Sequence, residues 1–170
     1  MFSSYKSLTV LFGSLVRSHL EYVSIVWNPF YEYGINRIEK IQKRFTRFAL
    51  RKNFSFDNMP PYDNRCNLLG ILELSNRRKL QGIIFIKDIM DSNIDSPELL
   101  SILSFRIPTR SLRETHLFAI PFHRTNYGMN EPMTRCLQTF NLIANSVDIT
   151  LDTYSFKRSV LRLFYSDTSV

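Results

Sequence analysis

The stretch GINRIEKIQKRFTRFALRK, residues 34–52, decides the fold class of this chain. Its apolar residues recur at the spacing of three and four that is typical of an amphipathic α-helix. Placed at about 100° per residue, they fall on one side of the helix axis, and these residues are Ile35, Ile38, Ile41, Phe45 and Phe48. The stretch is therefore predicted to form a helix with one buried side.

The opposite side of this predicted helix is cationic. The basic residues of the stretch are Arg37, Lys40, Lys43, Arg44, Arg47, Arg51 and Lys52. All of them except Lys43 and Lys52 fall within an arc of about 80°. A solvated helix face usually mixes both signs of charge, with Glu one turn from Lys, and here only Glu39 could form such a pair. This pattern predicts a surface that binds polyanions.

The excess of positive charge is concentrated in the first third of the chain. The formal net charge is +7 over 170 residues. Residues 1–53 carry nine basic and three acidic side chains, whereas residues 54–170 carry 13 and 12. A localised patch produces such a distribution, and a generally alkaline protein does not.

The remainder of the sequence also favours helices. Only five glycines and seven prolines are present, and Leu, Ile and Phe dominate the apolar residues. Residues 4–27 show helical periodicity, and NPFYEYG at residues 28–34 interrupts it. Because this connection is short, the two helices are expected to pack as an antiparallel pair. We therefore expect a basic helical hairpin over residues 1–53.

Residues 54–170 are expected to form a small irregular helical bundle. One short helix should end at Gly70, another should be capped by Ser75 and run to about residue 92, and a third should begin at Pro97. A long loop at about 105–130 precedes two final helices at 131–145 and 153–164. The predicted fold is mostly α, a helical hairpin followed by this bundle.

No residue pattern indicates a metal, a cofactor or a membrane span. Cys66 and Cys136 are far apart in the sequence and are interpreted as reduced thiols in the core. The spacing of His19, His116 and His123 is not that of metal ligands. Trp27 is expected to be a core residue that closes the hairpin. No apolar run approaches the length of about 20 residues that crosses a bilayer. We expect a soluble intracellular protein, in the nucleus or the cytoplasm.

Five phrases together resemble a known family. They are LVRSHLEYVSIVWNPF, RIEKIQKRFTRFAL, PPYDNRCNLLGILELSNRRK, DSPELLSIL and IPFHRTNYGMNEPMTR. In this order and spacing they resemble the C-terminal part, downstream of the catalytic palm, of insect-type non-LTR retrotransposon reverse transcriptases of the LINE-like, jockey type. The resemblance covers roughly residues 4–164 and implies a thumb-like element that grips the backbone of RNA, DNA or an RNA–DNA hybrid.

The same resemblance implies that the chain does not polymerise DNA by itself. A reverse transcriptase uses paired aspartates to hold two metal ions, and no Asp-Asp pair occurs in this sequence. Asp88, Asp91 and Asp95 have other spacings and are interpreted as solvated carboxylates near a helix end. The chain is expected to be a catalytically inert fragment or remnant of such an enzyme.

Two alternatives for the whole chain remain open at this point. The basic helix could dock an acidic protein partner or the missing polymerase palm, or the chain could be a transposon relic without function. A second contact with nucleic acid could come from Phe122, Arg124 and Tyr127, which combine aromatic rings with a guanidinium. For that segment we favour an ordered loop in which Thr and Asn cap turns and Phe122 packs inward.

Overall fold

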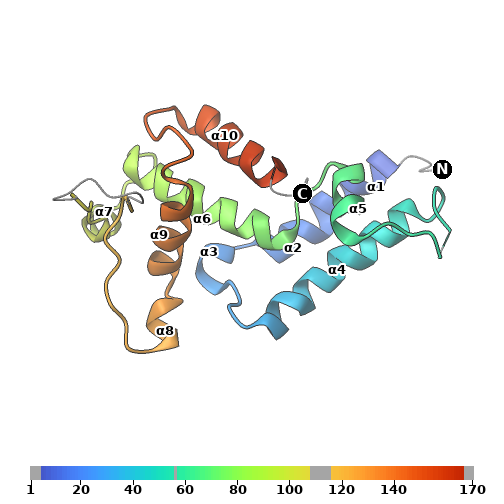
Figure 1. The fold of residues 1–170 in the computed structure, drawn as a ribbon, viewed down its shortest axis with the longest axis horizontal. Coiled ribbons are helices and arrows are strands. Elements are labelled where there is room, and N and C mark those ends of the chain that lie inside the picture. The colour runs from blue at the N-terminus through green and yellow to red at the C-terminus, as the bar shows by residue number, and fades with distance from the viewer. Residues whose placement is uncertain (1–4, 56, 108–115, 167–170) are drawn as a thin grey trace. The chain divides into compact units, whose positions relative to one another are not determined.

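The computed structural model describes residues 5–55, 57–107 and 116–166, and within them the fold is helical, as predicted (Figure 1). The N-terminal helices are α1 (Tyr5–Phe12), a π-helical turn η1 (Gly13–Arg17), α2 (Ser18–Glu21), α3 (Ser24–Trp27), α4 (Glu32–Leu50) and α5 (Tyr62–Leu69). They are followed by α6 (Leu74–Met90), α7 (Pro97–Ile102), α8 (Asn126–Met129), α9 (Pro132–Ile143) and α10 (Thr153–Ser166). The described part contains one isolated antiparallel bridge, between Phe105 and Phe118.

The chain divides into two compact units, residues 1–78 and 79–170. The sequence suggested a division near residue 53, at the end of the basic helix. The first unit extends further because α5 and the start of α6 pack against α4. Both Tyr62 and the backbone of Leu74 form hydrogen bonds with the Glu39 side chain of α4.

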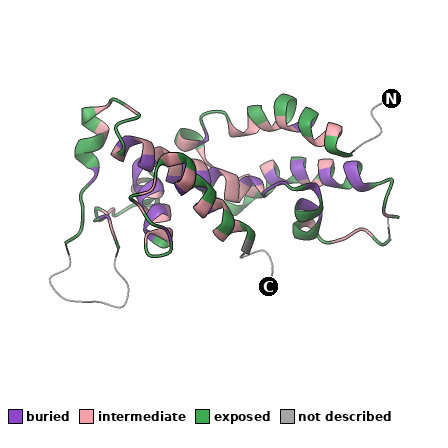
Figure 2. Cartoon of the chain, turned by 90° about the horizontal axis from the view of Figure 1, so that it is seen from above, coloured by how far each residue is buried: buried purple, intermediate pink, exposed green. Residues whose placement is uncertain are grey.

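The first unit contains the expected antiparallel hairpin. Helix α4 runs back alongside α1 in Figure 1, and the ring of Phe12 stacks on the ring of Phe45 with centroids 4.0 Å apart. The same end of α4 encloses a small core with α5, made of Ala49, Leu50, Cys66, Leu69 and Ile71. Buried positions recur along α4 but are rare along α1 (Figure 2). Helix α4 is therefore the central element of this unit.

The first long helix predicted over residues 4–27 is interrupted, which corrects the sequence-based expectation. Val23 has a φ of 51° in the left-handed region, and the chain begins a new helix, α3, immediately after it. A β-branched residue rarely adopts this conformation, so periodicity gave no warning of the break. Trp27 is also not a core residue, since it is 41% exposed and its indole N–H donates to the Tyr22 carbonyl.

The second unit is held together by buried phenylalanines. Phe118 meets Phe140 edge to face, and Phe140 stacks on Phe156 of α10. The Asn141 side chain bonds both the N–H and the C=O of Phe118, at 2.9 and 3.0 Å. This pairing fixes the segment around Phe118 to helix α9.

Candidate nucleic-acid interface

The cationic residues predicted from the sequence lie on and just after α4. Those that are exposed are Arg37, Lys40, Arg44, Arg47, Arg51 and Lys52, whereas Lys43 is half-buried. Within the residues that the structure describes, none of the seven forms an ion pair with a carboxylate. Arg37 lies above the ring of Tyr33, one turn earlier, with the guanidinium carbon 5.7 Å from the ring centroid. The result is a ridge of unneutralised positive charge, which we call the cationic ridge.

Glu39, the one acidic residue of the quoted stretch, points away from this ridge. It is 6% exposed, and its carboxylate accepts hydrogen bonds from the backbone N–H groups of Leu74 and Ser75, at 3.0 and 3.2 Å. These N–H groups belong to the first turn of α6, where the helix dipole favours a negative charge. Glu39 therefore caps α6, a role that the sequence assigned to Ser75. It is not a surface partner for Lys or Arg.

A hydrogen-bonded polar group accompanies Glu39 on the buried side of α4. The Tyr62 hydroxyl donates to Glu39, and the Gln42 amide donates to the Tyr62 oxygen at 3.0 Å and to the Leu72 carbonyl at 2.9 Å. Burial and the hydrogen bond to Glu39 raise the pKa of Tyr62 well above its ordinary value, so the phenol stays protonated. These bonds fix the rotation of α4 about its axis. That rotation directs the cationic ridge outward.

The predicted apolar side of α4 is only partly buried. Phe45 packs on Phe12, but Ile41 is 39% and Phe48 is 63% exposed. The fully enclosed positions are Gln42 and Thr46, each at 0% exposure. The side of α4 that is buried therefore does not coincide with the predicted apolar stripe. It is shifted around the helix axis toward Glu39 and Gln42, which form hydrogen bonds with α5 and α6.

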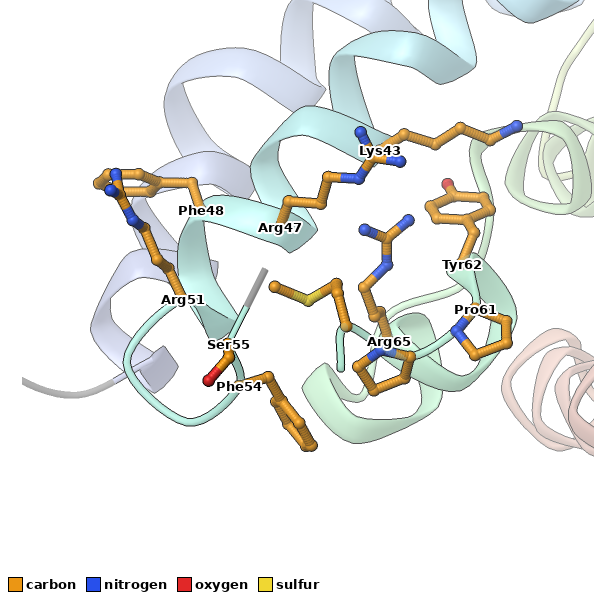
Figure 3. Close-up of a pocket in the computed structure, with 11 residues that line it drawn as sticks. Lys43, Arg47, Phe48, Arg51, Phe54, Ser55, Pro61, Tyr62 and Arg65 are labelled. Carbon is orange, nitrogen blue, oxygen red and sulfur yellow. The ribbon is translucent and has the colours of Figure 1, made fainter. Parts of the chain in front are cut away.

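Between α4 and α5 lies a cavity of about 1060 Å³ that the sequence did not reveal (Figure 3). Lys43, Arg47 and Arg51 line it from α4 and the turn that follows, and Tyr62 and Arg65 line it from α5. Arg65 was not among the predicted site residues. The sequence did contain one indication of its position. Arg65 follows Tyr62 by three residues and precedes Leu69 by four, and this helical spacing places it on the buried side of α5.

The second predicted segment lies in the other unit and is exposed. Phe122 is 89% and Tyr127 is 83% exposed, and Arg124 is exposed as well. The expectation that Phe122 packs inward is therefore wrong. Thr125 does cap α8 by accepting from Gly128, as expected, and the neighbouring ring of His123 packs against Gly128 and contacts Thr134. His123 takes the inward position that we had assigned to Phe122.

Polar residues at and just after the end of α6 have structural partners. Lys87 forms an ion pair with Asp91 at 2.5 Å, and the Asn93 amide donates to Asp88 at 3.1 Å. Cys66 and Cys136 are free and buried, and burial raises the pKa of the Cys66 thiol to about 11. Among the described residues, no three His, Cys, Asp or Glu side chains cluster so that they could hold a metal ion.

No family model, curated protein or solved structure matches the chain. In the part of the chain that the structure describes, no helix combines the length and the apolar character needed to cross a membrane.

Proposed function

We propose that this chain binds the sugar-phosphate backbone of nucleic acid through the cationic ridge of α4, and that it derives from the thumb and following region of a non-LTR retrotransposon reverse transcriptase. The proposal assigns it no polymerase chemistry, because the sequence holds no pair of adjacent aspartates. RNA, DNA and an RNA–DNA hybrid are all candidate ligands, since phosphate contacts alone do not distinguish among them.

The observation that carries the proposal is the segregation of charge on α4. Arg37, Lys40 and Arg44 are exposed on the outer side, while Glu39, the only acid in the stretch, is buried and bonded to α6. A helix face that serves only solubility usually carries acidic and basic side chains together, whereas the solvent-exposed face of α4 lacks the acid of this stretch. Phosphates of a nucleic-acid strand would supply the missing counter-charge, and their binding would release condensed cations.

A second candidate function is docking of a protein partner, and one observation favours it. Four apolar side chains of the first helical segment are largely exposed: Val10 at 70%, Leu15 at 65%, Tyr22 at 76% and Val26 at 61%. Large apolar side chains gathered on one segment are typical of protein contact surfaces. In the family that the sequence resembles, the polymerase palm is the natural partner for such a surface.

The two candidates respond differently to nucleic-acid length and to salt. We would measure the fluorescence anisotropy of labelled RNA–DNA hybrids of several lengths, each titrated with the whole chain over a series of salt concentrations. The proposal predicts binding that strengthens with length, tolerates any base sequence and weakens with a log–log salt slope of about −3 to −5. A folded chain that binds no hybrid at low salt would reject the proposal and leave the protein-docking function or a relic without function.

A further inference from the structure

The cavity between α4 and α5 contains a buried cation whose hydrogen-bonding groups are not all satisfied. Arg65 is 3% exposed, and its Nε and Nη1 atoms have no hydrogen-bond partner among the described residues. Buried guanidinium groups are ordinarily paired with an anion or fully hydrogen-bonded, because removing the charge from water is costly. The Arg65 guanidinium therefore requires a further hydrogen-bond acceptor, which a bound ligand could supply.

The surroundings of Arg65 increase this deficit of negative charge. Lys43, Arg47 and Arg51 line the same cavity, and none of the described residues that line it is acidic. The Arg65 guanidinium carbon lies 5.7 Å and the Lys43 ammonium 5.1 Å from the centroid of the Tyr62 ring. Figure 3 shows the Arg65 guanidinium directed toward the side of the cavity where Arg47 and Lys43 lie.

Electrostatics supports the same interpretation. Burial lowers the pKa of the Arg65 guanidinium, and the positive charge of Arg47 lowers it further. The Glu39 carboxylate, which bonds the Tyr62 hydroxyl, is already occupied by that hydroxyl and by the N-terminus of α6. Lys43 also interacts with the partly buried Glu73, but no carboxylate of the described chain lines the cavity beside Arg65 and Arg47, and a ligand with negative charge would neutralise these two cations.

We infer that this cavity is a phosphate-binding pocket in which Arg65, Arg47 and Lys43 hold one phosphate group of a nucleic-acid strand. Arginine suits phosphate because its planar fork of N–H groups can donate two parallel hydrogen bonds to two phosphate oxygens. The cavity is large enough for a phosphate together with its nucleoside. The same chemistry is present in inorganic phosphate and in free nucleotides.

This inference rests on the proposed function, because it makes the pocket a deeper part of the same backbone-binding surface. The pocket differs from the cationic ridge in what it can bind. The ridge attracts any polyanion, whereas the pocket fixes a single phosphate with a buried arginine. A mononucleotide should therefore bind the pocket with measurable affinity, although it carries only one phosphate group.

The test is the melting temperature of the whole chain in inorganic phosphate, in a nucleoside 5′-monophosphate and in a short oligonucleotide, at constant ionic strength set with chloride. At a ligand concentration about tenfold above Kd, the melting temperature should rise by about 3 °C. Arg65→Met should abolish the rise in inorganic phosphate and in the monophosphate, and should reduce it in the oligonucleotide, which the ridge still binds. Arg47→Gln, an exposed position that does not endanger folding, should weaken binding about tenfold. The control, Arg158→Gln on an exposed site of α10, should respond like the wild type.

The outcomes separate the pocket from the ridge. A response of the wild type to oligonucleotide alone would be explained by the ridge and would overturn the inference, whereas a response to all three that Arg65→Met weakens would identify the phosphate group as the ligand. If Arg65→Met and Arg47→Gln bind as the wild type does, the inference is overturned while the ridge keeps its proposed function. A wild type that responds to monophosphate but binds no hybrid would support the pocket and reject the proposed function. No response of the wild type to any of the three would also overturn the inference.

Discussion

At the scale of single residues, Glu39 determines which side of α4 faces water. Its carboxylate joins three parts of the first unit, namely α4, Tyr62 of α5 and the first turn of α6. A glutamate in a basic helix is most simply interpreted as a surface ion-pair partner, and Glu39 is the only residue of the stretch that could take that role. The actual role depends on contacts 23 and 35 residues away along the chain, which local periodicity cannot report.

Glu39→Gln should destabilise the fold. The substitution removes a buried charge that bonds two backbone N–H groups and a phenol, so we expect a loss of about 2 kcal/mol in the free energy of unfolding. Urea denaturation of the variant measures this loss. Glu32→Gln, an exposed acid on the first turn of the same helix, is the control and should cost less than about 1 kcal/mol. Equal stability of the wild type and Glu39→Gln would contradict the capping role.

A second residue, Glu73, should make stability depend on pH near neutrality. Its pKa is raised to about 7 by burial, by a hydrogen bond to Asp63 and by the charges of Asp63 and Glu39, while Lys43 lowers it. The folded chain therefore keeps a proton that the unfolded chain releases near pH 4.5. Stability should fall as pH rises from about 4.5 to 7, by the order of 1 kcal/mol because the group is partly solvated.

The check is urea denaturation at pH 5 and pH 8 for the wild type and for Glu73→Gln. The glutamine cannot ionise, so the variant should lose this part of the pH dependence and be relatively more stable at pH 8. A wild type that is more stable at pH 8 than at pH 5, with the same difference in the variant, would show that Glu73 titrates normally.

At the scale of elements, the first helical segment is broken by backbone conformation rather than by composition. Val23 holds a φ of 51°, which costs a β-branched residue about 1–2 kcal/mol relative to right-handed helix. Val23 is 45% exposed, so its side chain contributes little burial. Burial of the valine side chain therefore does not offset the free-energy cost of the left-handed conformation at this position.

Val23→Gly should accordingly stabilise the protein. Glycine accepts the left-handed conformation without a steric penalty, and after the added entropy of the unfolded chain we expect a net gain of about 0.5–1 kcal/mol. The measurement is the melting temperature. Val26→Gly, in the right-handed conformation of α3, should lower it instead. If both substitutions lower the melting temperature equally, the break at Val23 does not carry strain.

Elements with strong local signals could be predicted from the sequence, and those set by distant contacts could not. Helix α5 ends where Gly70 adopts a φ of 62°, and α7 begins at Pro97, both as expected from the residue types. The outward position of Phe122, by contrast, follows from the packing of His123 on Gly128 and Thr134. The local sequence of a loop does not determine which of two neighbouring side chains is buried.

The candidate site divides in the same way. The exposed positions of Arg37, Lys40, Arg44 and Arg47 on α4 agree with the helical spacing, because charge and spacing are properties of the stretch itself, while their contact with nucleic acid stays a prediction. The pocket was not, because it requires α5 to fold back on α4 and bury Arg65 beside Arg47. Folding thus adds a built anion site to a surface that the sequence already marks as cationic.

At the scale of the whole molecule, charge is distributed unevenly. The first 53 residues carry a net charge of +6 and the remaining residues +1, so nearly all the excess belongs to the first unit. Exposed basic residues of the second unit, such as Lys157, Arg158 and Arg162 of α10, contribute to the total without forming part of the cationic ridge. They permit a comparison in which net charge is held constant.

That comparison tests the central claim most directly. The salt dependence of binding to an RNA–DNA hybrid should be measured by anisotropy for two triple variants: one with Arg37, Lys40 and Arg44 changed to Gln, and one with Lys157, Arg158 and Arg162 changed to Gln. Neither set lines the pocket, and each removes three exposed positive charges.

If the ridge contacts phosphates, the first variant should flatten the log–log salt slope by about 2–3, and the second should leave it close to the wild-type value. Equal slopes in the two variants would mean that only net charge matters, and would contradict the claim that α4 grips a nucleic-acid backbone.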